Sequence, residues 1–85
     1  AVRAMVTVEL YGKYAELAGG VISVDVALPI TLSELSAALS AQHPMLAEAL
    51  AHPRTRFCVN DAVVLGEASV QAGDTVALFP PVSGG

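Results

Sequence analysis

Hydrophobic and polar residues alternate in two segments near the start of the chain, which predicts a pair of strands. The first segment runs from Met5 to Tyr11 and the second from Ile22 to Leu28. In each of them every second position is apolar, as a strand with one buried face requires. Residues 13–18 are expected to form a turn or a short helical segment. The two strands should therefore pair as an opening hairpin with an elaborated turn.

The clearest predicted element is an amphipathic helix over residues 31–42. Thr31 and Glu34 have the T-x-x-E spacing of a capping box, in which each side chain accepts a hydrogen bond from the other residue's backbone N–H. Ile30 and Leu35 occupy the flanking positions of a hydrophobic staple. Leucine and alanine then recur on one face at helical spacing, with serines on the other, so one side of this helix is predicted to be buried.

Shorter segments complete the predicted fold. Pro44 is expected to begin a second, short helix that ends at Pro53, since proline is tolerated in a first turn. Turn residues separate three further strands, predicted at 56–59, 62–65 and 75–79. A right-handed crossover through the main helix makes the first and last strands parallel neighbours at the sheet centre. We therefore expect an α+β fold of the β-grasp, ubiquitin-like type, with a mixed sheet of about five strands, one main amphipathic helix packed across it and a short second helix.

Composition and charge narrow the classes of function. The chain has 85 residues, of which 54% are hydrophobic and 14% charged, and a single domain of this size must bury most of its apolar residues. The excess of apolar residues indicates either a hydrophobic surface for a partner or an alanine-rich core. The net charge of −4, from four basic and eight acidic residues, disfavours nucleic acid and anionic membrane surfaces as ligands.

Three further features favour a cytoplasmic location. No apolar run reaches the roughly 20 residues that span a bilayer. The N-terminal residues lack the long apolar stretch of a signal peptide. The single cysteine, Cys58, cannot form an internal disulfide, and disulfides are typical of oxidising compartments.

Residues that could catalyse a reaction or bind a metal are few. His43 and His52 are nine positions apart, without the spacing of a zinc site, and are interpreted as loop or capping residues. The eight carboxylates are scattered singly, and no pair of them suggests acid–base catalysis. Cys58 has only Arg56 as a basic neighbour in its predicted strand, so it is interpreted as a small buried hydrophobic residue. No metal site and no bound cofactor are expected.

The C-terminal residues give the strongest functional signal. The chain ends with F-P-P-V-S-G-G, directly after the last predicted strand. Two prolines stiffen an extended segment, and two glycines would let a narrow channel close around the backbone. The α-carboxylate of Gly85 is then the reactive group that the tail presents. We predict a β-grasp domain over residues 1–79 and an extended diglycine tail over residues 80–85 that enters the active site of a partner.

From Met5 onward the residues resemble the small subunit of molybdopterin synthase, the MoaD type of ubiquitin-like sulfur carrier. The specific part is the ending from Val70 to Gly85, V-Q-A-G-D-T-V-A-L-F-P-P-V-S-G-G, with its Gly-Asp turn, Phe-Pro-Pro junction and final diglycine. The opening strand, the turn that follows it and the helix fall in corresponding places. Thr75 departs from the family pattern, in which an acidic residue is common, at the edge of a strand.

The resemblance implies a mechanism. An ATP-dependent adenylating and sulfur-transferring enzyme converts the carboxylate of Gly85 to an acyl-adenylate, and sulfur then displaces AMP to leave a thiocarboxylate. The tail enters the large subunit of molybdopterin synthase, where the sulfur passes to a cyclic pyranopterin monophosphate and builds the dithiolene. The large subunit is expected to supply the catalytic residues, so this chain would be a non-catalytic carrier that binds no cofactor, with ATP used by the activating enzyme.

Each residue of the tail has an expected role. Gly85 carries the adenylate and the thiocarboxylate, and Gly84 passes through the channel. The residues that direct the tail are Pro80, Pro81, Val82 and Ser83. Phe79 is expected to dock on the partner, because its side chain alternates with the inward-facing positions of its strand. Packing of this ring in the core is the alternative.

Other interpretations share the activated Gly85. Another carrier of the same fold would deliver sulfur for thiazole, cysteine or tRNA thiolation. The two prolines before the diglycine and the length of 85 residues favour the molybdopterin carrier, since thiazole carriers tend to be shorter. A ubiquitin-type protein modifier would instead join Gly85 to a lysine of a target. A free-standing enzyme is the remaining alternative.

Overall fold

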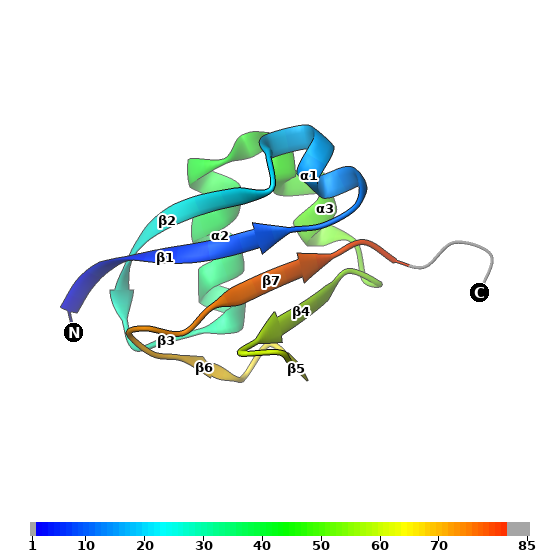
Figure 1. Ribbon diagram of the computed structural model, residues 1–85. Coiled ribbons are helices and arrows are strands. Elements are labelled where there is room, and N and C mark those ends of the chain that lie inside the picture. The colour runs from blue at the N-terminus through cyan, green and yellow to red at the C-terminus, as the bar shows by residue number, and fades with distance from the viewer. Residues whose placement is uncertain (1, 82–85) are drawn as a thin grey trace.

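A five-stranded mixed sheet forms one layer of the protein, and helices cover one of its faces (Figure 1). The computed structural model describes residues 2–81. The order of strands across the sheet is β2 (Val21–Leu28), β1 (Val2–Leu10), β7 (Val76–Phe79), β4 (Arg56–Val59) and β5 (Ala62–Val64). β1 and β7 run parallel at the centre, and all other neighbouring strands are antiparallel. The predicted β-grasp fold is confirmed.

The helices lie where the sequence pattern predicts them. α1 (Lys13–Ala18) joins the first two strands, and α2 (Leu32–Gln42) crosses the sheet (Figure 1). The second helical segment begins at Pro44, as predicted, with a 3-10 turn, η1 (Pro44–Leu46), that leads into α3 (Ala47–Ala51). It ends at Ala51 rather than at Pro53, because His52 has an extended backbone and acts as the C-cap.

Two features of the sheets go beyond the sequence-based expectation. β1 begins at Val2 instead of Met5, because its antiparallel register with β2 extends from Glu9–Val21 to Val2–Leu28. A second, two-stranded sheet pairs β3 (Ile30–Thr31) with β6 (Ser69–Val70). Each of these strands has only two residues, so no alternation is visible in the sequence.

The core lies between the sheet and α2. It is built from the inward-facing residues of β1, β2 and β7 and from three leucines of α2, and within residues 2–81 it contains no buried polar side chain. Its most deeply buried side chains are Val8, Val24, Leu35, Leu39, Leu46, Val70, Val76 and Leu78. Burying a leucine or a valine contributes roughly 1.5–3 kcal/mol, so this layer holds the helix on the sheet.

Polar contacts fix both ends of α2. At its start the backbone N–H of Glu34 donates to the Thr31 hydroxyl at 3.2 Å, and the backbone N–H of Thr31 donates to the Glu34 carboxylate at 3.0 Å, so the predicted capping box is confirmed. At its far end Gln42 accepts from the backbone N–H of Asp25 at 2.9 Å and donates to the carbonyl of Asp25 at 2.8 Å. The helix therefore also covers the outer edge of β2, which would otherwise present unpaired backbone groups.

The capping box generates a first prediction. Thr31→Ala should lower the free energy of unfolding by about 1 kcal/mol at neutral pH, because the helix loses an N-cap acceptor. Urea denaturation measures this change. Ser40→Ala is the matched control, since it removes a hydroxyl from the same helix that makes no side-chain hydrogen bond with the described residues, and it should change stability by less than about 0.5 kcal/mol.

The same variant has a predicted pH dependence. Hydrogen bonds from the backbone N–H and the hydroxyl of Thr31 hold the pKa of Glu34 below its ordinary value of 4.5. The folded state therefore binds the Glu34 proton less tightly than the unfolded state. The stability that these hydrogen bonds add is present above pH 4.5, the ordinary pKa, and is lost as the pH falls through the lower pKa of the folded state. Thr31→Ala loses the hydroxyl donor to the Glu34 carboxylate but keeps the backbone N–H donor, so the stability difference between wild type and variant should shrink in part between about pH 5 and pH 3. A constant difference would mean that the Thr31 hydroxyl does not stabilise this carboxylate.

Candidate functional site

The last described residues leave the sheet at the end of its central strand. The ring of Phe79, at the end of β7, stacks on the ring of Tyr11, which directly follows β1, with centroids 4.5 Å apart and planes inclined by 7°. The backbone N–H of Tyr11 donates to the carbonyl of Leu78 at 3.2 Å. Because β1 and β7 are parallel neighbours, their ends lie side by side and bring these two rings together.

Tyr11 is held in place by its hydroxyl as well as by its ring. The hydroxyl donates to the carboxylate of Glu9 at 3.0 Å. This hydrogen bond and the negative charge of Glu9 raise the pKa of Tyr11 above its ordinary value, so the phenol stays protonated and neutral at physiological pH. The stacked pair therefore presents an uncharged aromatic surface beside the last strand.

Gly12 shapes the point at which the chain leaves the sheet. Its φ of +58° lies in a region that side-chain-bearing residues rarely adopt, and a Cβ atom there would lie 2.9 Å from Cγ of Pro80. The ring of Pro80 thus packs directly against the turn between β1 and α1. Phe79 and Pro80 are each anchored to this turn, which fixes the direction of the chain as it leaves β7.

An apolar hollow surrounds this point on the solvent-facing side of the sheet. It has a volume of about 680 Å³. We call its apolar lining the exit patch, which consists of Tyr11, Cys58, Val63, Phe79, Pro80 and Pro81. The side chain of Val63 is 67% exposed, although β5 belongs to the sheet. A contiguous apolar surface at the exit of the chain is typical of a protein–protein contact.

The position of Cys58 corrects the interpretation made from the sequence. This residue is partly exposed rather than buried. Its strand neighbours Phe57 and Val59 pack against the core, so the alternation of the strand turns Cys58 toward the exit patch. The alternation of the strand predicts an outward Cys58 once Phe57 is assigned to the buried face.

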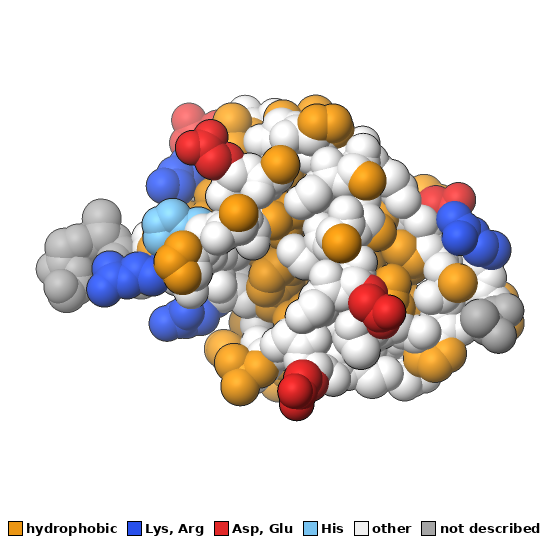
Figure 2. Space-filling view, turned by 180° about the vertical axis from the view of Figure 1, so that it is seen from behind, with side chains coloured by type: hydrophobic (Ala, Val, Ile, Leu, Met, Phe, Trp, Pro, Cys, Tyr) orange, Lys and Arg blue, Asp and Glu red, His pale blue; other side chains and the backbone are white. Residues whose placement is uncertain are grey.

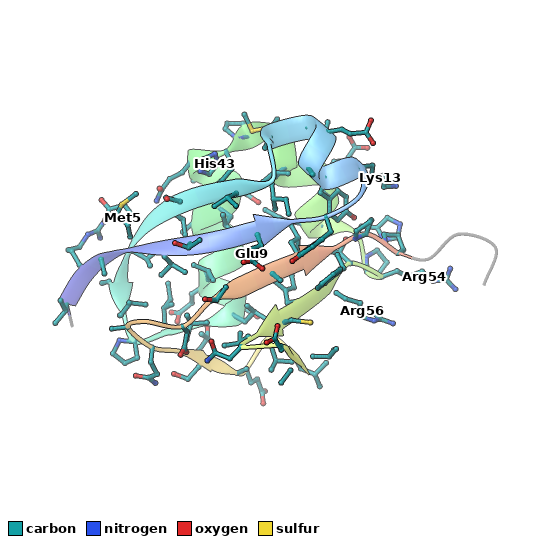
Figure 3. All side chains as sticks on the ribbon, viewed as in Figure 1. Met5, Glu9, Lys13, His43, Arg54 and Arg56 are labelled. Carbon is teal, nitrogen blue, oxygen red and sulfur yellow. The ribbon has the colours of Figure 1, made fainter. Side chains whose placement is uncertain are left out.

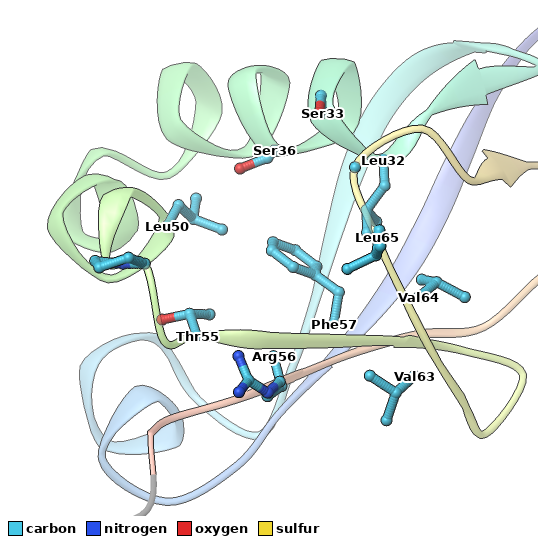
Figure 4. Close-up of a pocket in the computed structure, with 12 residues that line it drawn as sticks. Leu32, Ser33, Ser36, Leu50, Thr55, Arg56, Phe57, Val63, Val64 and Leu65 are labelled. Atoms are coloured by element: carbon cyan, nitrogen blue, oxygen red, sulfur yellow. The ribbon is translucent and has the colours of Figure 1, made fainter.

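A second hollow lies on the helix side of the sheet, between α2, α3 and β5 (Figure 4). Its volume is about 520 Å³. The ring of Phe57 lies between Leu50 and Leu65, with the hydroxyls of Ser33 and Ser36 on the side of the helix (Figure 4). No pattern in the sequence predicts this hollow. It contains no nucleophile paired with a base and no pair of carboxylates, so nothing in its lining indicates catalysis.

Other candidate residues have structural positions. His43 is the C-cap of α2 and His52 the C-cap of α3, as interpreted from the sequence. Within residues 2–81 no three potential metal ligands of the His, Cys, Asp or Glu type form a group. In the same range no helix has the length and apolar character needed to cross a membrane.

Of the predicted site residues, the structure brings Phe79, Pro80 and Pro81 together at the exit patch. Phe79 lies on the face opposite to the buried Val76 and Leu78, so its ring does not belong to the core. Its docking role stays a prediction. The remaining predicted residues lie outside the described part of the chain, and they are Val82, Ser83, Gly84 and Gly85.

These features define a class, the ubiquitin-like β-grasp proteins that lead a C-terminal segment out from a central strand. Residues 8–85 match the model of the ThiS family. The small archaeal modifier protein 1 of Haloferax volcanii is 38% identical over 85 aligned positions, which cover 91% of this chain and 97% of that protein. The chain therefore belongs to the ThiS family, as a ubiquitin-like protein of the sulfur-carrier and modifier type.

Solved structures agree with this assignment. The crystal structure of SAMP1 from Haloferax volcanii has a TM-score of 0.84 and 29% identity, covering 96% of this chain and all of that chain (100%). A chain of the BexX/CysO complex from Amycolatopsis orientalis has a TM-score of 0.72 and 29% identity, covering 94% of this chain and 99% of that chain. The second structure shows that a protein of this fold assembles with a partner protein.

Gly12 generates a second prediction. Gly12→Ala should lower the free energy of unfolding by more than about 1 kcal/mol, because alanine is strained at this φ and its Cβ meets Pro80. Urea denaturation measures the loss, and the NMR signals of the Tyr11 and Phe79 rings should shift. Gly20→Ala is the matched control, since nothing lies within 4 Å of a Cβ built there. Equal effects of both substitutions would contradict the anchoring of Pro80.

Proposed function

We propose that this chain is the sulfur carrier of a molybdopterin synthase, used with Gly85 as its last residue. An ATP-dependent enzyme adenylates the carboxylate of Gly85, and a sulfur nucleophile displaces AMP to leave a thiocarboxylate. The tail then enters a large subunit, where its sulfur passes to a cyclic pyranopterin monophosphate. The chain itself contributes no catalytic side chain and no cofactor, and it works in the cytoplasm.

The anchored exit of the chain is the observation that carries this proposal. Phe79 and Pro80 are fixed against Tyr11 and Gly12, so the residues beyond Pro81 start from a defined point and direction. Four residues in extended conformation reach about 13 Å, far enough to place a terminal group inside another protein. A carboxylate is a poor electrophile, which explains why activation by ATP must precede sulfur transfer.

The family match supports the adenylation of Gly85. The residues around the exit support molybdopterin synthase, over other sulfur pathways, as the destination of the sulfur. The match extends to residue 85 and so includes both terminal glycines. The Phe-Pro-Pro junction that resembles the small subunit of molybdopterin synthase is the segment that forms the anchored exit. An apolar exit patch beside it offers a surface on which a large subunit can dock.

A second candidate function is protein modification. It is favoured by the 38% identity to the small archaeal modifier protein 1. In this case the activated Gly85 would form an amide with a lysine of a target protein. Sulfur delivery in another pathway, such as thiazole, cysteine or tRNA thiolation, would share the thiocarboxylate and differ in its acceptor.

A third prediction concerns Gly85. Incubation with the adenylating enzyme, ATP and a sulfur source should replace one oxygen of the chain by sulfur, as measured by intact mass. The charged chain with its large subunit should then convert the pyranopterin precursor. Lysine-linked conjugates without this mass change would favour the modifier, and a charged chain that leaves the precursor unchanged would favour another sulfur pathway.

Truncation provides the control for this experiment. Deleting Gly85 should abolish charging, because the activated carboxylate would lie one residue short of the catalytic groups, while the circular dichroism spectrum stays unchanged. Deleting Ala1 from the other end should leave charging intact. A form extended beyond Gly85 that works without being cut would refute the mechanism.

A fourth prediction concerns the exit patch. Val63→Asp should weaken binding of the large subunit by about tenfold or more, because it buries an unpaired charge in the contact. Val21→Asp is the matched control, since both valines belong to outer strands of the same sheet and are similarly exposed, at 67% and 63%. It should change the dissociation constant less than about twofold. Calorimetric titration of both variants measures this, and equal losses would place the contact elsewhere.

A further inference from the structure

Basic side chains gather at the end of the molecule where the chain leaves the sheet. Of the four basic residues in the chain, Lys13, Arg54 and Arg56 lie at this end, close to the end of β7 (Figure 3). Figure 2 shows the same grouping of Lys and Arg side chains from the opposite side. The fourth, Arg3, lies near the start of β1 and forms an ion pair with Asp25 at 3.3 Å. A chain with a net charge of −4 thus has one basic end.

The two arginines are held in place by the residue between them. The hydroxyl of Thr55 donates to the carbonyl of Ala49 in α3 at 2.7 Å and lies 2.6 Å from the hydroxyl of Tyr14 in α1. Arg56 is paired with Phe79 in the register of β4 and β7, so its charge lies beside the exit. Both arginines are exposed, but the backbone from which they project is fixed to two helices.

These cations lack acidic partners among residues 2–81. The one ion pair within 4.0 Å in that range is that of Arg3 with Asp25. The side chain of Arg56 donates a hydrogen bond to the backbone carbonyl of Arg54 at 3.4 Å. Lys13 shares a shallow hollow with Glu16 and Glu48, so the uncompensated charge rests on the arginines. Among residues 2–81 no carboxylate therefore competes with an external anion for these two arginines within ion-pair distance.

We infer that Arg54 and Arg56, assisted by Lys13, form a docking surface for carboxylates of the adenylating enzyme, at the rim of the channel in which that enzyme receives the tail. This inference rests on the proposed function, because it assumes that the tail enters a partner protein. The cations lie near the end of β7, where the tail begins, so they would meet the partner where the channel opens. An acidic rim would attract this end of the carrier and orient it before the apolar exit patch makes contact.

The position of the cations distinguishes a protein rim from a nucleotide phosphate. A phosphate joined to Gly85 would be about 13 Å beyond Pro81 when the tail is extended. That distance exceeds the Debye length of about 8 Å at physiological salt, so charges at the base would act weakly on it. Carboxylates at the entrance of the channel would instead lie in direct contact with the arginines.

A fifth prediction tests this inference with the adenylating enzyme that charges Gly85. Pyrophosphate exchange gives KM and kcat for the carrier. At low salt Arg54→Glu and Arg56→Glu should each raise the KM for the carrier by about fivefold or more with little change in kcat, because they slow association. Arg3→Glu, which changes the net charge equally at the opposite end, should change KM less than about twofold. Arg54→Lys should retain most of the wild-type KM, since a cation is kept.

Salt dependence gives an independent readout. The KM of the wild-type carrier should rise between about 50 and 300 mM NaCl, and the rise should be smaller for Arg54→Glu. Equal effects of Arg3→Glu and Arg54→Glu would overturn the inference, as would a fall in kcat or a higher KM for ATP at unchanged KM for the carrier. If Arg54→Glu and Arg56→Glu leave the KM for the carrier unchanged while the wild type is still charged, the proposed function stands without this docking surface. If the wild type is never charged, both are refuted.

Discussion

The parallel pairing of β1 with β7 is the constraint on which the rest of the structure depends. It puts the last strand at the centre of the sheet, where Val76 and Leu78 are buried and β4 covers its other edge. The same pairing puts the turn after β1 beside the exit from β7, so Tyr11 and Gly12 meet Phe79 and Pro80. The buried central strand of the sheet is therefore also the element that sets the direction in which the chain leaves.

The two outer strands of the sheet differ in how far other residues cover them. On β2, α2 covers the backbone through Gln42 and His43, whose side chains contact Asp25 and Ser23 at 2.8–2.9 Å. On the other side, β5 has three residues and carries the exposed Val63. Exposed apolar side chains also occur away from the exit, among them Met5, Val21 and Leu65, so the exit patch holds only part of the excess of hydrophobic residues noted in the sequence. The covered edge of β2 discourages unwanted strand addition.

Much of the fold could be predicted from the sequence because local and long-range signals agree. Alternation marks β1 and β2, and the capping box marks the start of α2 to the residue. The two-residue strands β3 and β6 could not be predicted, because their pairing depends on a contact between Ile30 and Val70 that no periodicity reveals. At the site, the outward orientation of Phe79 followed from strand parity, whereas the stack with Tyr11 and the close fit of Gly12 to Pro80 required the three-dimensional register.

The central position of β7 also has a mechanical consequence. A protein that grips the residues beyond Pro81 and pulls along the strand loads the hydrogen bonds to β1 and β4 sideways, because ladder bonds lie across the strand direction. Bonds loaded in this way share the force and yield together, whereas an outer strand would peel away bond by bond. A strand in this central position therefore resists a pull along its own direction better than an outer strand of the same sheet would.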